Sequence, residues 1–214
     1  MSQMIKIKKF PFCVFIGILC SCAYHTTFNL KELNSSNCIE YDDDNIIVRV
    51  KPFVNRDELI DTFGCDLVGG GILPVQVYIF NELPYAIGIN KDNFILSEPN
   101  RKSFAGTNAE TIFERAKDEY WSTAVWTAAF GVWGFLASAG TIADSRIKLD
   151  ADLQSKSFKS GTIAANGSSG GIVFFEIEKG KRNLDNLFLT FPVFSRKSEK
   201  NFLIKMSLAC DQCY

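Results

Sequence analysis

The sequence predicts a mainly β domain, specifically an immunoglobulin-like β-sandwich with an inserted hydrophobic helix or helical hairpin. Short apolar or alternating runs recur along the chain, with Gly, Asn and Ser turn residues between them. About eight short strands arranged in this way are typical of a sandwich. A long uncharged stretch, residues 121–143, interrupts the strand pattern. We therefore expect a domain at 45–214 with its insert at about 108–145.

Residues 1–21 have the pattern of a secretory signal peptide. The basic stretch MSQMIKIKK is followed by the apolar run FPFCVFIGIL and then by small residues. The apolar run is shorter than the roughly 17 residues that a transmembrane helix needs. We therefore expect this segment to be cleaved, which would make the chain more negative by removing its lysines.

The end of this segment, Leu19-Cys20-Ser21-Cys22, resembles the lipobox of bacterial lipoproteins, which is an aliphatic residue, two small residues and a cysteine. The resemblance implies that Cys22 carries the lipid and becomes the mature N-terminus. Cys20 fits less well, because Leu19 would then directly precede it. Ala23 follows Cys22, so we expect the outer membrane rather than the inner one. The alternatives are a plain cleaved signal and an uncleaved N-terminal anchor.

Residues 22–44 are polar and predict a tether between the lipid and the domain. A short helix is expected at 57–63, and a strand with alternating apolar residues at 73–81. The other expected strands are 46–50, 85–89, 93–97, 147–154, 157–163, 172–178, 187–194 and 201–208. The expected turns are 82–84, 166–171 and 180–183.

The insert is expected to begin as a helix, because Thr107 and Glu110 fit a capping box. Three interpretations of the apolar segment, residues 121–143, remain open. It is a transmembrane span, a helix or hairpin packed on the sandwich, or a hairpin that dips into the bilayer. Tryptophan favours the membrane interface, but it also fills protein cores. The candidate membrane-contact residues are Trp121, Trp126 and Trp133.

Four cysteines remain if Cys22 is lipidated, namely Cys38, Cys65, Cys210 and Cys213. An even number in an oxidising compartment predicts disulfides, with three pairings open. The C-terminal Cys210-x-x-Cys213 spacing also admits a thiol redox site or a zinc site. We expect neither, because the pair lies at the end of the chain and the other two cysteines lack this spacing.

Other chemistry finds little support in the sequence. The single histidine, His25, lies next to the expected lipid, and no Ser-centred nucleophile motif is present. Gly69-Gly70-Gly71 precedes a strand rather than a helix and lacks the GK[ST] of a phosphate loop. The chain has 23 basic and 24 acidic residues, so nucleic acid is not an expected partner. We expect no enzyme activity, no cofactor and no metal.

Two strand motifs, GILPVQVYIFN at 71–81 and GIVFF at 171–175, carry a family resemblance. They match the patterns G-x-x-P-V-Q-V-x-I-x-N and G-x-V-F-F. Together with the lipobox and the Ala/Gly-rich insert, they resemble an uncharacterised family of envelope lipoproteins with an immunoglobulin-like domain from chlamydia-related and legionella-like bacteria. The resemblance covers most of 45–195 and implies location and fold, not mechanism.

The expected function is that of a membrane-anchored envelope lipoprotein with a binding or structural role. The membrane is the expected partner through the N-terminal lipid, and a protein is a candidate partner through the hydrophobic insert. One alternative is a thiol redox or zinc-binding protein that uses Cys210 and Cys213. The other is a protein that inserts into membranes through the apolar segment.

Overall fold

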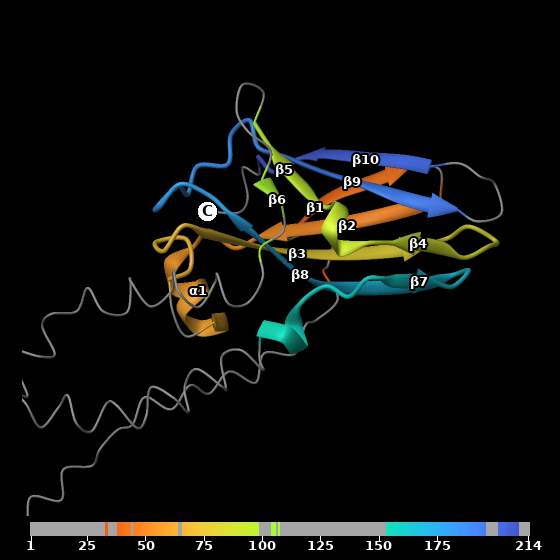
Figure 1. Ribbon diagram of the computed structural model, residues 1–214, viewed down its shortest axis with the longest axis horizontal. Helices are drawn as coiled ribbons and strands as arrows, with labels where there is room; N and C mark the ends of the chain where they lie inside the picture. The colour runs from red at the N-terminus through yellow and green to blue at the C-terminus, as the bar shows by residue number, and fades with distance from the viewer. Residues whose placement is uncertain are drawn as a thin grey trace, which may run out of the picture.

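The computed structural model describes residues 33, 38–43, 45–63, 66–98, 104–105, 107, 153–195 and 201–209. These residues are mainly β and form two antiparallel sheets, which confirms the mainly β prediction and is consistent with a β-sandwich. The longer strands of both sheets run in roughly the same direction, close to horizontal in Figure 1, whereas the short β5 crosses them obliquely. The predicted insert lies outside the described residues.

Sheet A contains strands β1 (Ile39–Asp43), β2 (Ile46–Pro52), β3 (Ile72–Asn81) and β8 (Gly167–Glu176), in that order. Buried and partly buried residues alternate along β2, as the sequence predicts for a strand with one buried face. The first half of β3 is buried on both faces. The short helix α1 (Arg56–Phe63) confirms the predicted helix and packs Phe63 against Phe53 and Phe174.

Sheet B is built around β9 (Phe188–Ser195). One edge of β9 pairs with β10 (Asn201–Ser207). The other edge pairs with two short strands in succession, β5 (Ile95–Ser97) and β4 (Ile87–Ile89), which the 3-10 helix η2 (Lys91–Asn93) separates. Beyond these lie β6 (Phe104–Ala105), paired with β5, and β7 (Gly161–Ile163), paired with β4.

The core lies between the inward faces of the strands and is rich in phenylalanine. Phe94 stacks on Phe191 of β9 with ring centroids 4.2 Å apart, and it also contacts Phe158 at 5.3 Å. Phe158 reaches this position because residues 157–158 run beside β8, where the Phe158 N–H donates to the Ile172 carbonyl at 2.9 Å. This segment therefore links the edge of sheet A to the core below sheet B.

The strand predicted at 147–154 is wrong at its described end. Residues 153–156 form a helical turn, which continues into a hydrogen bond from the Ser157 N–H to the Leu153 carbonyl at 2.9 Å. Leu153 and Lys156 are both buried, and their spacing of three residues suits one face of a helix. The alternation in the sequence includes Leu153 and Gln154, but these two residues are helical rather than extended.

The turn predicted at 166–171 is also wrong, because only its first residue is a turn. Asn166 has a positive φ of 54°, and β8 begins at the next residue. Gly170 and Gly171 serve close packing instead. A Cβ atom on Gly170 would lie 2.4 Å from the Tyr78 ring, and one on Gly171 would lie 2.3 Å from the Phe158 Cα atom.

The sheet also extends into the range 22–44, which the sequence analysis assigned to a tether. Residues 39–43, IEYDD, form β1 and pair with β2 throughout their length. Asp42 and Asp43 therefore belong to an edge strand, where charged side chains are common because they discourage pairing with other chains.

Candidate binding surface

Most of the predicted site residues lie outside the described part of the chain. They are Cys22, Cys65, Cys210, Cys213, Trp121, Trp126 and Trp133. Cys38 is described, is partly buried and immediately precedes β1. Within the described ranges, no three His, Cys, Asp or Glu side chains are grouped so that they could hold a metal ion. None of the helices in those ranges has the length and apolar character needed to cross a bilayer.

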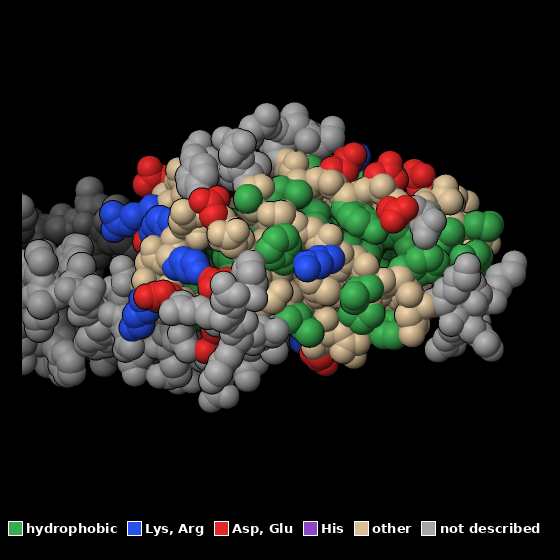
Figure 2. Space-filling view, turned by 90° about the horizontal axis from the view of Figure 1, so that it is seen from above, with side chains coloured by type: hydrophobic (Ala, Val, Ile, Leu, Met, Phe, Trp, Pro, Cys, Tyr) green, Lys and Arg blue, Asp and Glu red, His purple; other side chains and the backbone are tan. Residues whose placement is uncertain are grey.

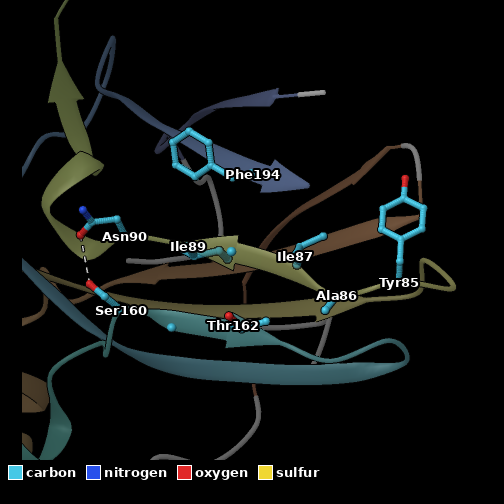
Figure 3. A pocket seen from close by; sticks show the side chains of 10 residues that line it. Tyr85, Ala86, Ile87, Ile89, Asn90, Ser160, Thr162 and Phe194 are labelled. Carbon is cyan, nitrogen blue, oxygen red and sulfur yellow. Dashed lines mark hydrogen bonds between the residues drawn. The ribbon is translucent and has the colours of Figure 1, made fainter. Parts of the chain in front are cut away.

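A groove of about 700 Å³ runs over β4 and β7 on the outer side of sheet B (Figure 3). Its floor includes Gly88 of β4 and Gly161 and Thr162 of β7. Phe194 of the neighbouring β9 forms a wall, and Tyr85 lies at one end. The groove therefore has an aromatic wall above a floor of small residues.

The two glycines keep the floor low without being needed for the backbone. A Cβ atom on Gly88 would make ordinary contacts with Phe194 at 3.8–3.9 Å, and a Cβ atom on Gly161 would meet nothing within 4 Å. Neither glycine has a positive φ. A larger side chain could stand at both positions, and at Gly88, which faces outward opposite Thr162, it would fill part of the space that the groove now occupies.

The end of the groove opposite Tyr85 is polar. The Asn90 Oδ1 atom accepts hydrogen bonds from Ser160 Oγ and from the Asp92 N–H, both at 3.0 Å. Ser160 Oγ in turn accepts from the Lys91 N–H at 2.9 Å. These contacts fix the Asn90 side chain and leave its Nδ2 group without a hydrogen-bond partner among the described residues. The exposed amide can therefore donate to a ligand.

The groove continues into a wider apolar surface. We use the name sheet B face for the outward side chains of β4, β5, β7, β9 and β10. Successive residues of a strand point to opposite faces, and the buried Leu189, Phe191 and Val193 point inward. The outward side chains are Gly88, Ile95, Ser97, Thr162, Phe188, Thr190, Pro192, Phe194, Asn201, Leu203, Lys205 and Ser207.

Three large hydrophobic side chains of this face are exposed to solvent. The exposed fraction is 39% for Ile95, 36% for Phe194 and 67% for Leu203. Among the described residues, one other large hydrophobic side chain is as exposed, Ile60 on α1 at 41%. Figure 2 views the molecule from the side where β5, β9 and β10 lie uppermost in Figure 1. Hydrophobic side chains gather there around one basic side chain, and acidic side chains border them along one edge.

The two sheets differ in charge. Strands β4, β5, β7, β9 and β10 contain no acidic residue and one basic residue, Lys205, whose Nζ lies 4.9 Å from the centre of the Phe188 ring. Sheet A carries its acids on β1 and at the end of β8. The sheet B face is thus suited to a partner that is apolar, or apolar and anionic.

The amino-acid pattern does not predict this surface. It predicts the strands but not which face of each strand is covered. One signal was present. FLTFPVFS of β9 is apolar on both faces, as in strands that are buried on both sides, whereas the structure leaves its outer face partly exposed.

Comparison with known proteins does not assign this chain to a family. No protein-family model and no curated protein matches it. Among solved structures it is similar to the candidate lipoprotein ycdA from Bacillus subtilis subsp. subtilis str. 168, with a TM-score of 0.38 and 14% identity over 78% of this chain. The matched part covers 38% of the length of ycdA.

Two further solved structures are comparably distant. The yjhA protein from Bacillus subtilis has a TM-score of 0.40 and 12% identity, over 78% of this chain and 95% of yjhA. A functionally unknown protein from Listeria monocytogenes EGD-e has a TM-score of 0.38 and 9% identity, over 79% of this chain and 80% of that one.

Proposed function

We propose that the protein is a lipoprotein of the bacterial cell envelope, anchored through Cys22 to the outer rather than the inner membrane. Its β domain has a binding role without catalysis, and the sheet B face with its groove is the binding surface. An immunoglobulin-like sandwich is part of this proposal, supported by the two antiparallel sheets around one core.

The observation that carries the binding role is the exposure of Ile95, Phe194 and Leu203 on one face beside an open groove. Single exposed hydrophobic residues are ordinary on soluble proteins, but several on one face mark an interaction surface. The fixed Asn90 amide adds a hydrogen-bond donor at the end of the groove. A mostly apolar site with a few oriented polar groups is the usual form of a binding pocket.

The anchor is supported by the sequence pattern of residues 1–22 and by the position of the first strand. Leu33 is buried against the domain and its carbonyl accepts a hydrogen bond from Arg49 Nη1 at 3.1 Å, so a segment of 22–32 would join the lipid to the domain. Fully extended, such a segment would reach about 36 Å. That length lets the domain approach the membrane surface or stand away from it.

The anchor is tested by metabolic labelling with an alkyne analogue of palmitate in a bacterial host that processes lipoproteins. Cys22→Ala is expected to abolish labelling, because it removes the thiol that receives the lipid. Cys20→Ala is the matched control and is expected to keep it. Labelling that survives Cys22→Ala, or that is lost with Cys20→Ala, would refute the assignment of Cys22.

A second contact is proposed for the apolar segment, with a protein partner or with the bilayer. Its length and lack of charge are the only support for this, and both come from the sequence. Its tryptophans suit a membrane interface. The carbonate extraction described in the Discussion tests whether this segment holds the membrane independently of the lipid.

A further inference from the structure

We propose that the occupant of the sheet B face is the membrane itself, so that the domain lies on the bilayer with lipid in the groove above Gly88 and Gly161. This inference rests on the proposed lipid anchor and specifies the partner of the same surface. It differs from membrane contact through the apolar segment, because it uses only strands of the folded sheet.

The exposed side chains of the sheet B face suit contact with an apolar layer. Ile95, Phe194 and Leu203 project from three different strands of one face, so they can enter the same apolar layer together. Pro192 lies beside Leu203 in the register of β9 and β10 and continues the apolar surface. The groove offers about 700 Å³ of open space over small residues, into which part of an acyl chain can fit.

The charge of the sheet B strands also suits a membrane surface. Bacterial and other membranes that contain anionic lipids attract basic residues near their surface and repel acidic ones. The strands of sheet B carry no acid, and Lys205 is their one charged residue. In the adjoining connection, Glu98 is paired with Lys181. No acidic side chain of these strands therefore opposes contact with headgroups.

The long side chain of Lys205 suits the boundary between acyl chains and headgroups. Lysine can lay its methylene groups on apolar surface while its ammonium group stays in the polar layer. Lys205 already does so over the Phe188 ring, with 4.9 Å between Nζ and the ring centre. The positively charged ammonium group of Lys205 thus lies beside the apolar side chains of the face. In a bilayer the negatively charged headgroup phosphates lie beside the acyl chains in the same way.

The proposed lipid anchor on Cys22 would also favour contact between the domain and the membrane. A short flexible linker holds two attached groups at an effective concentration in the millimolar range. A lipid on Cys22 would hold the sheet B face near the bilayer in this way. Three partly exposed side chains and one lysine then suffice to keep the face on the bilayer for a substantial fraction of the time. The same weak surface on an unanchored protein would leave it in solution.

The test places the photo-reactive amino acid p-benzoylphenylalanine at Phe194, Leu203 or Ile60 of the full chain, expressed in a bacterial host. Ile60 is the matched control, an exposed hydrophobic residue on α1 rather than on sheet B. After irradiation of isolated membranes, mass spectrometry identifies what each position has captured. Lipid adducts at 194 and 203 but not at 60 are the expected result.

Each other result overturns the inference. Lipid adducts at all three positions would mean that the tether brings the whole domain near the membrane and that no particular face contacts it. Adducts at 194 and 203 with residues 108–145, with a second copy or with another protein would identify a different occupant. Absence of adducts at 194 and 203 would mean that nothing lies on the face. Circular dichroism confirms that each variant is folded.

A matched pair of isoleucines adds a quantitative measurement. Ile95→Asp removes an apolar contact and places a carboxylate against the headgroups, so the yield of lipid adduct at 203 is expected to fall roughly tenfold. Ile60→Asp makes the same change at a similar exposure on α1 and is expected to leave that yield unchanged. Equal effects of the two substitutions would contradict the inference.

The same membrane samples separate this inference from the proposed function. The mass of the N-terminal peptide reports whether Cys22 is acylated. If it is acylated and 194 and 203 capture no lipid, only the inference about the sheet B face fails. If it is not acylated, the proposed anchor fails.

Discussion

Gly171 of β8 lies where the backbone of Phe158 passes closely, and replacing it with alanine is expected to destabilise the domain. The added Cβ would lie 2.3 Å from the Cα atom and 2.6 Å from the backbone nitrogen of Phe158. Neither atom can move away by a simple side-chain rotation. Overpacking of this kind costs about 1–3 kcal/mol, and weakening the bond from the Phe158 N–H to the Ile172 carbonyl adds about 1 kcal/mol.

We therefore expect Gly171→Ala to lower the free energy of unfolding by about 3 kcal/mol, or the melting temperature by roughly 6–12 °C. Urea unfolding in mild detergent, followed by far-UV circular dichroism, measures the loss. Gly161→Ala is the control, because its Cβ would meet nothing within 4 Å. That variant is expected to be unchanged or more stable by up to about 1 kcal/mol.

Gly170→Ala provides an intermediate case. Its Cβ would lie 2.4 Å from the Tyr78 ring, which is a side chain that can turn aside. We expect a loss smaller than that of Gly171→Ala. A loss at Gly171 no greater than the loss at Gly161 would refute the argument that close backbone approach is the reason for glycine in β8.

Three further results are expected. Asp66→Ala should lower the free energy of unfolding by about 2–3 kcal/mol in the same urea assay, because Arg182 loses the buried carboxylate that pairs with it. The Arg182 side chain is a third exposed, so water compensates part of the loss. A loss under about 0.5 kcal/mol would contradict this reasoning. Cys22→Ala behind a cleavable secretion signal should be released by alkaline carbonate if lipid is the anchor, whereas an unaggregated protein that stays in the pellet would show that the apolar segment holds the membrane. Cys210 and Cys213 should resist thiol-specific reagents until reduced, and reversible reactivity or bound zinc would favour the redox or zinc alternative.

The strands that the sequence predicted well are those with one buried face or a continuous apolar run. Residues 46–50, 73–81 and 187–194 fall within β2, β3 and β9 to within one residue or two, because burial imposes a period of two or an unbroken apolar stretch. The helix at 57–63 was placed equally well as α1. Local pattern therefore located the elements whose apolar residues recur regularly or without interruption along the sequence.

The errors fall where distant residues decide the local structure. IEYDD of β1 is acidic and becomes a strand because β2 pairs with it. The glycines at 170–171 resemble a turn and lie in a strand because Tyr78 and Phe158 pack where Cβ atoms would be. Tertiary contacts override local propensity in these cases. The groove was missed for the same reason, since small residues form a floor only when β4, β7 and β9 are brought together.

The pairing of β3 with β8 has a consequence for when the domain can fold. This ladder joins residues as far apart in sequence as Ile72 and Glu176, and sheet B joins Ile95 to Thr190. Contacts between such distant residues form slowly, because a long loop must close before any of them is made. Neither sheet can be completed until the last third of the chain is available. A chain secreted from its N-terminus would therefore pass through a translocon before its fold could close, and the domain would form on the far side of the membrane.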